Sequence, residues 1–106
     1  MSGGALIGWP VNLAGESFYQ EAISACEPGQ GVALIPEPGN AHDPRAIMVW
    51  SEAGEQIGYV PRDSWVADAL LDEGDTLFAV IASMHGDAPM RAVVLDVFHA
   101  AGGGCP

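Results

Sequence analysis

The hydrophobic positions of this chain fall into short runs that are separated by turn-forming residues. The first run, Val11–Ala14, alternates apolar and polar residues, as a strand with one buried face does. Further runs of strand length follow at 32–35, 46–50, 56–60, 77–83 and 91–98. The chain's fourteen Gly and eight Pro residues favour turns over long helices, and a turn at 52–55 predicts a hairpin between the third and fourth strands.

Between the first two runs, the apolar spacing changes to that of one helix face. The residues at this spacing are Phe18, Tyr19, Ala22, Ile23 and Cys26. Ser17 and Gln20 have the spacing of a capping box, in which each side chain bonds the other's free amide, and Pro28-Gly29 ends the helix. We expect this face to be buried, with at least one of the two aromatic rings in the core.

A second helix is predicted after Pro61. Asp63 or Ser64 can cap it, and Gly74 closes it after about Asp72. Its apolar face consists of Trp65, Val66, Ala69 and Leu70. The element order β-α-β-β-β-α-β-β predicts a mainly β fold with two short helices, packed on a small OB-like or SH3-like antiparallel barrel.

The length of 106 residues fits one domain. We expect that domain to span 11–99, with a flexible lead-in at 1–10 and a flexible tail at 100–106. By their spacing, Trp50 and Trp65 belong to the core, whereas Trp9 either packs on the barrel or meets a partner. No apolar stretch approaches the roughly 20 residues that cross a bilayer, and the apolar start lacks a basic leader, so we expect a cytoplasmic protein with no membrane partner.

Charge narrows the choice of partners. Fourteen acidic residues face three arginines and no lysine, which gives a formal net charge of −11. Basic residues normally supply most of the affinity for nucleic acid, and this chain offers only Arg45, Arg62 and Arg91. Solubility is the simplest reason for such acidity. The two cysteines, Cys26 and Cys105, are too few for a disulfide framework, and we expect both to be free.

The most specific pattern lies between the second and fourth strands. Residues 37–49 read Glu-Pro-Gly-Asn-Ala-His-Asp-Pro-Arg-Ala-Ile-Met-Val, and residues 58–62 read Gly-Tyr-Val-Pro-Arg. Upstream, residues 15–19 read Gly-Glu-Ser-Phe-Tyr. In this order and spacing the chain resembles the HIRAN family over roughly residues 11–97. We refer to residues 37–49 and 58–62 together as the signature.

The resemblance implies a site and a ligand. HIRAN domains of eukaryotic DNA-remodelling helicases bind the 3′-hydroxyl end of single-stranded DNA. By position, their aromatic pair corresponds to Phe18 and Tyr19, their aspartate to Asp43, and their later ring to Tyr59. Ser17 stands where those relatives have arginine, so one phosphate partner is missing.

The signature also carries charge and loop-forming residues. Arg45 and Arg62 lie in or beside it, where a phosphate would be. Asn40 and Asp43 have a second interpretation, because short polar side chains hold irregular loops by bonding nearby backbone amides. Ligand contact and loop architecture therefore both remain open for these two residues.

The sequence gives little support for an enzymatic function. His42, His85 and His99 do not have metal-ligand spacing with the cysteines, no phosphate-binding glycine loop precedes a Lys-Ser or Lys-Thr pair, and no triad is visible. We expect no catalytic activity, no metal and no cofactor.

Two functions follow. The first is recognition of single-stranded DNA 3′ ends, linked to DNA repair or remodelling. Its site residues are Phe18, Tyr19, Asp43, Arg45, Tyr59 and Arg62. The alternative is an acidic protein-interaction or adaptor module that keeps the HIRAN fold without binding DNA and takes a basic protein partner. A self-associating barrel with a small ligand has the least support.

Overall fold

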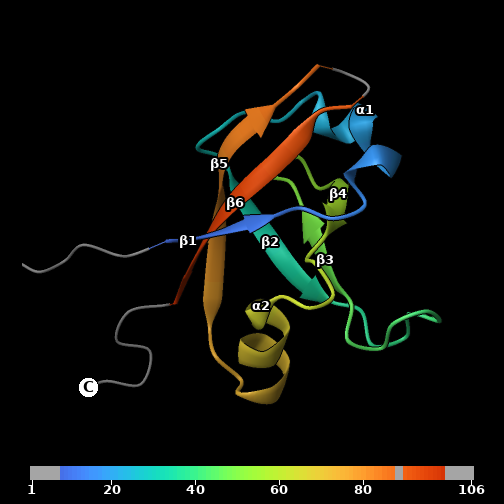
Figure 1. Cartoon of the computed structure of the whole chain (residues 1–106), viewed down its shortest axis with the longest axis vertical. Helices are drawn as coiled ribbons and strands as arrows, with labels where there is room; N and C mark the ends of the chain where they lie inside the picture. The colour runs from blue at the N-terminus through green and yellow to red at the C-terminus, as the bar shows by residue number, and fades with distance from the viewer. Residues whose placement is uncertain (1–7, 88–89, 100–106) are drawn as a thin grey trace, which may run out of the picture.

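The computed structural model describes residues 8–87 and 90–99. Most of the predicted lead-in, the predicted tail and Cys105 lie outside these ranges. Within them, antiparallel strands form one sheet in the order β1-β6-β5-β2-β3-β4, which curls into a half-barrel (Figure 1). The strands are β1 (Trp9–Asn12), β2 (Gly31–Pro36), β3 (Ile47–Trp50), β4 (Gln56–Tyr59), β5 (Leu77–His85) and β6 (Ala92–His99). The predicted mainly β class and element order are confirmed, although several strand ends differ by one or two residues.

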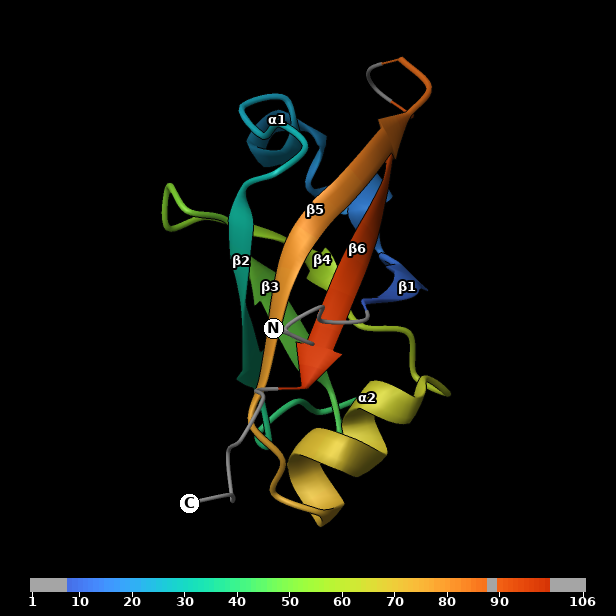
Figure 2. The same ribbon diagram turned by 90° about the vertical axis from the view of Figure 1, so that its left-hand side faces the viewer.

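Two features curl the sheet. β2 pairs with β5 at its beginning, through Gly31 and Val32, and with β3 along the rest of its length. The register shifts at Ala82 in β5 and beside Ile57 in β4, where one strand carries an extra residue. Such bulges bend a strand and increase its twist. The long β5–β6 ribbon therefore runs obliquely across the sheet (Figure 2).

The half-barrel closes where the chain that follows β1 meets the end of β4. Ala14 and Tyr59 exchange two backbone hydrogen bonds, each of 2.8 Å, in an isolated antiparallel bridge. The backbones approach this closely because residue 58 is glycine. A Cβ atom on Gly58 would lie 2.7 Å from Leu13 Cγ and 2.8 Å from the Ala14 carbonyl oxygen.

Alternate residues of the strands fill the interior. The largest fully buried side chains are aliphatic and come from α1, α2 and every strand except β1 and β2: Ile23, Ile47, Ile57, Ile81, Leu95, Val49, Val66, Val93 and Val97. Cys26 is buried among them as a free thiol. Trp50 and Trp65 are only partly buried, which corrects their prediction as core residues.

The first helical region differs from the prediction. It splits into a 3₁₀ turn, η1 (Glu16–Phe18), and one α-helical turn, α1 (Gln20–Ile23), after Gly15 in the left-handed conformation. The predicted capping box is wrong. The Gln20 side chain instead donates to the Arg91 carbonyl at 2.8 Å and accepts from the Arg91 amide at 2.8 Å, which ties α1 to the residue before β6.

The break also turns one predicted core ring outward. Phe18 is 84% exposed, while Tyr19 is partly buried and Ile23 fully buried. A continuous helix would place residues 18 and 22 on one face. The change from 3₁₀ to α geometry at Tyr19 breaks that alignment, so burial of Phe18 was predicted wrongly.

The second helical region begins as predicted. Ser64 caps α2 (Trp65–Ala67), because its hydroxyl oxygen accepts from the Val66 amide at 3.2 Å. The chain then widens into a π-helical turn, η2 (Asp68–Asp72), in which the Glu73 amide donates to the Asp68 carbonyl five residues back. Across the described ranges, no helix has the length and apolar character that crossing a bilayer requires.

Gly58→Ala tests the closure. The added methyl group would meet backbone and side-chain atoms at less than 3 Å, so we expect the free energy of unfolding to fall by about 1–3 kcal/mol. Urea denaturation followed by far-UV circular dichroism measures this loss.

Gly39→Ala is the matched control, because nothing lies within 4 Å of its added Cβ. It should be neutral or slightly stabilising. Equal effects of the two substitutions would show that close approach at Gly58 does not limit stability.

Candidate functional site

A surface cleft lies between the loop that follows β2 and the end of β4. It has a volume of about 360 Å³ and is lined by Ala14, Asn40, His42, Asp43, Ala46, Tyr59, Val60 and Arg62. Three of the six predicted site residues, Asp43, Tyr59 and Arg62, therefore share one cleft. We call it the signature cleft.

The loop between β2 and β3, residues 37–46, is held by its own polar side chains, and we call it the signature loop. Asn40 Oδ1 accepts from the amides of His42 at 2.8 Å and Asp43 at 2.9 Å, and Asn40 Nδ2 donates to Glu37 Oε1 at 2.9 Å. Asp43 Oδ1 accepts from the Arg45 amide at 3.0 Å. The predicted loop-forming role of both residues is confirmed. The second carboxylate oxygen of Asp43 is not used in this bond.

Tyr59 joins the loop to the barrel. Its hydroxyl donates to Glu37 Oε1 at 3.0 Å, while its backbone closes the half-barrel at Ala14. The Tyr19 phenol lies nearby: burial raises its pKa, and the Tyr59 hydroxyl and the Glu37 carboxylate raise it further. Tyr19 therefore remains a protonated hydrogen-bond donor at neutral pH.

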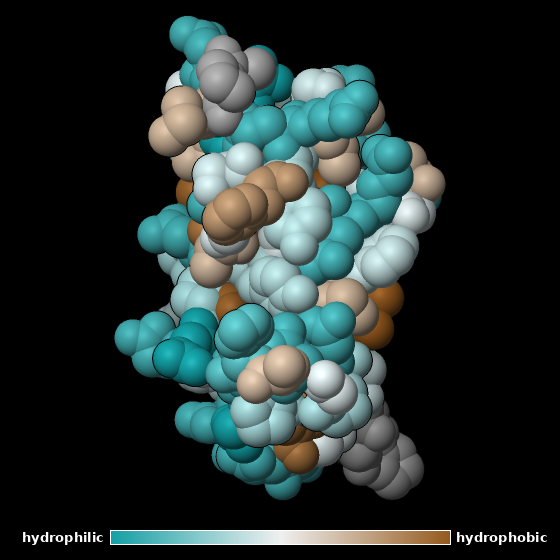
Figure 3. All heavy atoms as spheres, turned by 90° about the vertical axis from the view of Figure 1, so that its right-hand side faces the viewer, coloured by the Kyte–Doolittle hydropathy of each residue, from teal (hydrophilic) through white to brown (hydrophobic). Residues whose placement is uncertain are grey.

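The aromatic pair borders a neighbouring hollow and not the signature cleft. Phe18 and Tyr19 line it together with Glu21, Ala22, Glu55 and Gln56. Phe18 presents its ring to solvent, so the ring is available for stacking. Figure 3 views the side of the molecule that carries α1 and the signature loop, which is mainly hydrophilic with scattered hydrophobic side chains.

The two predicted arginines have different surroundings. The Arg62 side chain is 76% exposed at the signature cleft, with Nε 3.8 Å from Asp43 Oδ2 and one terminal nitrogen 3.3 Å from the His42 carbonyl. Arg45 instead turns to η2, where it pairs with Asp72 at 2.8 Å and with Asp68 at 2.9 Å. Its bond to Asp72 raises the pKa of Arg45 and lowers that of Asp72.

Two further residues lie beside these positions and are not among the six predicted site residues. Arg91 lines a third hollow together with Ser17 and Gln20, and no carboxylate of a described residue lies within 4.0 Å of its guanidinium group. No sequence signal places it there, because the contact depends on the Gln20 bonds to β6. Glu37 had a signal, since it opens the signature.

Metal chemistry has no visible centre in the described part of the chain. Among residues 8–87 and 90–99, no group of three His, Cys, Asp or Glu side chains converges. His42 and Asp43 both line the signature cleft but are not joined by a third such residue.

Comparison with known proteins identifies the family. The family model for the HIRAN domain matches residues 10–98, nearly the whole chain. The chain belongs to the HIRAN family. A crystal structure of a protein from Lactobacillus plantarum is 25% identical with a TM-score of 0.72, covering 90% of this chain and 95% of that one. The HIRAN domain of human HLTF is 22% identical with a TM-score of 0.68, covering 89% and 76%, respectively, and so supports the fold alone.

A search of curated proteins gives no match. Membership of the HIRAN family supports a nucleic-acid-binding domain in general, and a binding domain in preference to an enzyme. The predicted family and fold are thereby confirmed.

Asn40→Ala tests how the signature loop is held. The substitution removes the acceptor of the His42 and Asp43 amides, so we expect the free energy of unfolding to fall by about 1–2 kcal/mol. The Asp43 amide should also lose protection from hydrogen exchange.

Asn12→Ala, at an exposed position of β1, serves as the control and should leave both quantities unchanged. If Asn40→Ala behaves like this control, the loop does not depend on the Asn40 side chain.

Proposed function

We propose that this HIRAN domain binds single-stranded DNA at its 3′-hydroxyl end and serves DNA repair or remodelling. The observation that carries the proposal is the signature cleft, in which a carboxylate, an aromatic ring and an exposed guanidinium group surround one hollow of about 360 Å³. These groups belong to Asp43, Tyr59 and Arg62. The HIRAN resemblance implies the same kind of ligand.

Each group has a distinct task. Tyr59 stacks on the terminal base, an interaction worth about 1–3 kcal/mol. Asp43 Oδ2, which faces Arg62 Nε at 3.8 Å, accepts a hydrogen bond from the terminal hydroxyl, and Arg62 neutralises the adjacent phosphate. A terminal phosphate would meet Asp43 and the nearby Glu37 at close range, and like charges at such distances repel strongly.

The strand can continue over the neighbouring surface. Phe18 offers an exposed ring, and Arg91 offers a guanidinium group with no described carboxylate within 4.0 Å, in a hollow that Glu16 also lines. Arg91 lies beside Ser17, the position where the resemblance places a basic residue. We assign Arg91 the phosphate contact that Ser17 lacks.

The global charge sets the conditions for binding. A net charge of −11 repels DNA, but salt at physiological concentration screens this repulsion beyond about 8 Å. Contacts inside the signature cleft act over distances shorter than this screening length. The affinity for DNA therefore comes from these local contacts and is modest.

A basic protein is the second candidate partner. The net charge of −11 favours it, and so does the pairing of Arg45 with two carboxylates, which removes one of three cations from use on phosphate.

The 3′ end can be tested directly. Fluorescence anisotropy at physiological salt, with 5′-labelled decathymidylate, should give at least about tenfold weaker binding when the 3′ end carries a phosphate. Asp43→Asn keeps the acceptor for the Arg45 amide but removes the charge, so it should reduce this discrimination. Binding that ignores the 3′ phosphate, or no binding at all, would refute end recognition.

The role of Arg45 has its own test. Asp72→Asn removes the main carboxylate partner of Arg45. If Arg45 contacts phosphate, the domain should then bind DNA roughly two- to fivefold more tightly. Glu73→Gln makes the same change of charge next to it without an Arg45 contact. Equal gains from both variants would show that only net charge matters and that Arg45 is not a DNA contact.

A further inference from the structure

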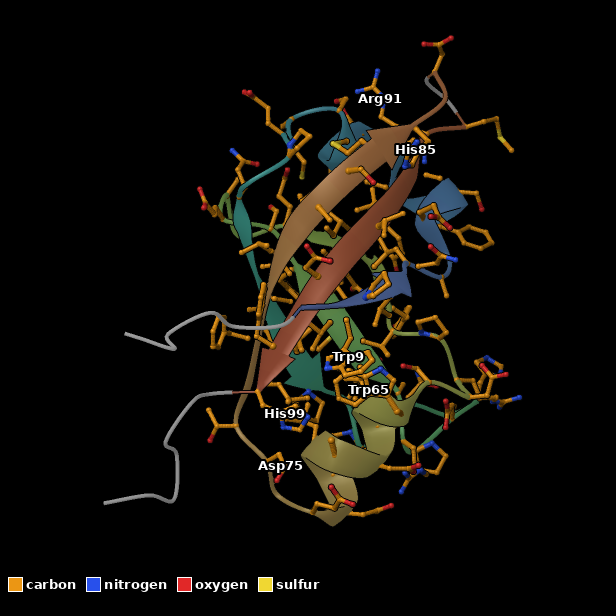
Figure 4. The ribbon with its side chains drawn as sticks, turned by 60° about the vertical axis from the view of Figure 1, so that its left-hand side comes forward. Trp9, Trp65, Asp75, His85, Arg91 and His99 are labelled. Atoms are coloured by element: carbon orange, nitrogen blue, oxygen red, sulfur yellow. The ribbon has the colours of Figure 1, made fainter. Side chains whose placement is uncertain are left out.

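A second cleft on this domain is lined by aromatic side chains. Trp9 of β1, Trp65 of α2 and His99 of β6 surround a hollow of about 300 Å³. Figure 4 shows the three side chains gathered where the end of β6 approaches α2, with Asp75 beside them. We call it the tryptophan cleft. It shares no lining residue with the signature cleft.

One wall of the tryptophan cleft is preformed. The rings of Trp65 and His99 stack with their centroids 5.5 Å apart and their planes 14° from parallel. Trp9 is paired in register with Val97, two residues before His99, so Trp9 and His99 belong to the same face of the sheet. Trp9 is 53% exposed, which leaves much of its indole in solvent.

Charge selects the ligand. The faces of indole rings carry negative electrostatic potential and attract cations, and tryptophan does so best. A carboxylate adds to this field, because Asp75 Oδ2 lies 3.6 Å from His99 Nδ1 and its side chain is 35% exposed.

The surroundings do not suit a phosphate. Arg45 is held by Asp68 and Asp72, and Arg62 lies at the signature cleft. Arg91 stands at the far end of β6 in Figure 4, eight residues from His99, or about 26 Å at the rise of a strand. A nucleic-acid strand at the tryptophan cleft would be repelled by the Asp75 carboxylate, and none of these three arginines is placed to attract its phosphates there.

From these observations we infer that the tryptophan cleft binds a cationic side chain, arginine or lysine, presented by a basic protein segment. Arginine fits best, because its planar guanidinium group stacks on aromatic faces and is weakly hydrated. This site gives the second candidate partner a place to bind and does not depend on the DNA contacts of the signature cleft.

The probes are acetylated tri-arginine amide and the matching tri-citrulline peptide, which is nearly isosteric but uncharged. Titrations of the full chain are followed through the indole N–H signals in NMR, where Trp50 serves as an internal reference. We expect tri-arginine to shift the Trp9 and Trp65 signals and tri-citrulline to bind at least about fivefold more weakly. Shifts of similar size and affinity with both peptides would refute the cationic ligand.

Variants separate the cleft from general attraction to an acidic protein. Trp9→Leu keeps an apolar side chain but removes the ring, and it should weaken tri-arginine binding roughly fivefold. Asp75→Asn should weaken it by a smaller factor. Phe78→Leu is the matched control, since Phe78 is also exposed but stacks on Phe98, and it should have no effect.

Unchanged affinity in Trp9→Leu would show that the peptide binds elsewhere on the acidic surface and would overturn the inference.

A third experiment titrates the same variants with decathymidylate. If Trp9→Leu abolishes DNA binding while tri-arginine leaves the indole signals unmoved, the tryptophan cleft stacks nucleobases and the inference fails. If Asp43→Asn loses DNA binding and Trp9→Leu does not, the DNA contacts lie at the signature cleft and the inference about the tryptophan cleft stands.

Discussion

Two backbone hydrogen bonds between Ala14 and Tyr59 determine where the candidate binding groups lie. They join a residue two positions after β1 to the last residue of β4, so the chain that follows Ala14 and the end of β4 meet at one corner. η1 begins two residues after Ala14, and the signature cleft is lined by Ala14 and Tyr59 themselves. The contact requires glycine at position 58, because any Cβ atom there would collide with the opposing strand. The position of the site is therefore a consequence of how the barrel closes.

Electrostatics act on two length scales in this domain. Over the whole molecule, acidic residues dominate and repel polyanions. Within a few ångströms of the signature cleft, Arg62 is exposed, while Asp43 and Glu37 are used to hold the loop and the Tyr59 hydroxyl. Such a site suits recognition of one chemical group at the end of a chain better than tracking along many phosphates.

The sequence predicted what depends on local pattern. Strand positions, the Ser64 cap and the hairpin follow from periodicity and turn chemistry, and three residues of the signature share a cleft: Asp43, Tyr59 and Arg62. The failures involve partners distant in sequence. Gln20 bonds Arg91, 71 residues away, and not Ser17, while Arg45 turns to an aspartate 27 residues away. No periodicity encodes such pairs. The exposure of Phe18 was missed for a different reason, a change of helix type at Tyr19.

β1 lies at one edge of the sheet and pairs with β6 alone among the described strands. Four residues long, it contains Pro10, which has no N–H group. An unpaired strand edge is a template onto which a second copy can add, and proline and short length both weaken that template. The domain can therefore display Trp9 on an open edge with little risk that copies stack strand to strand, so exposure there need not lead to aggregation.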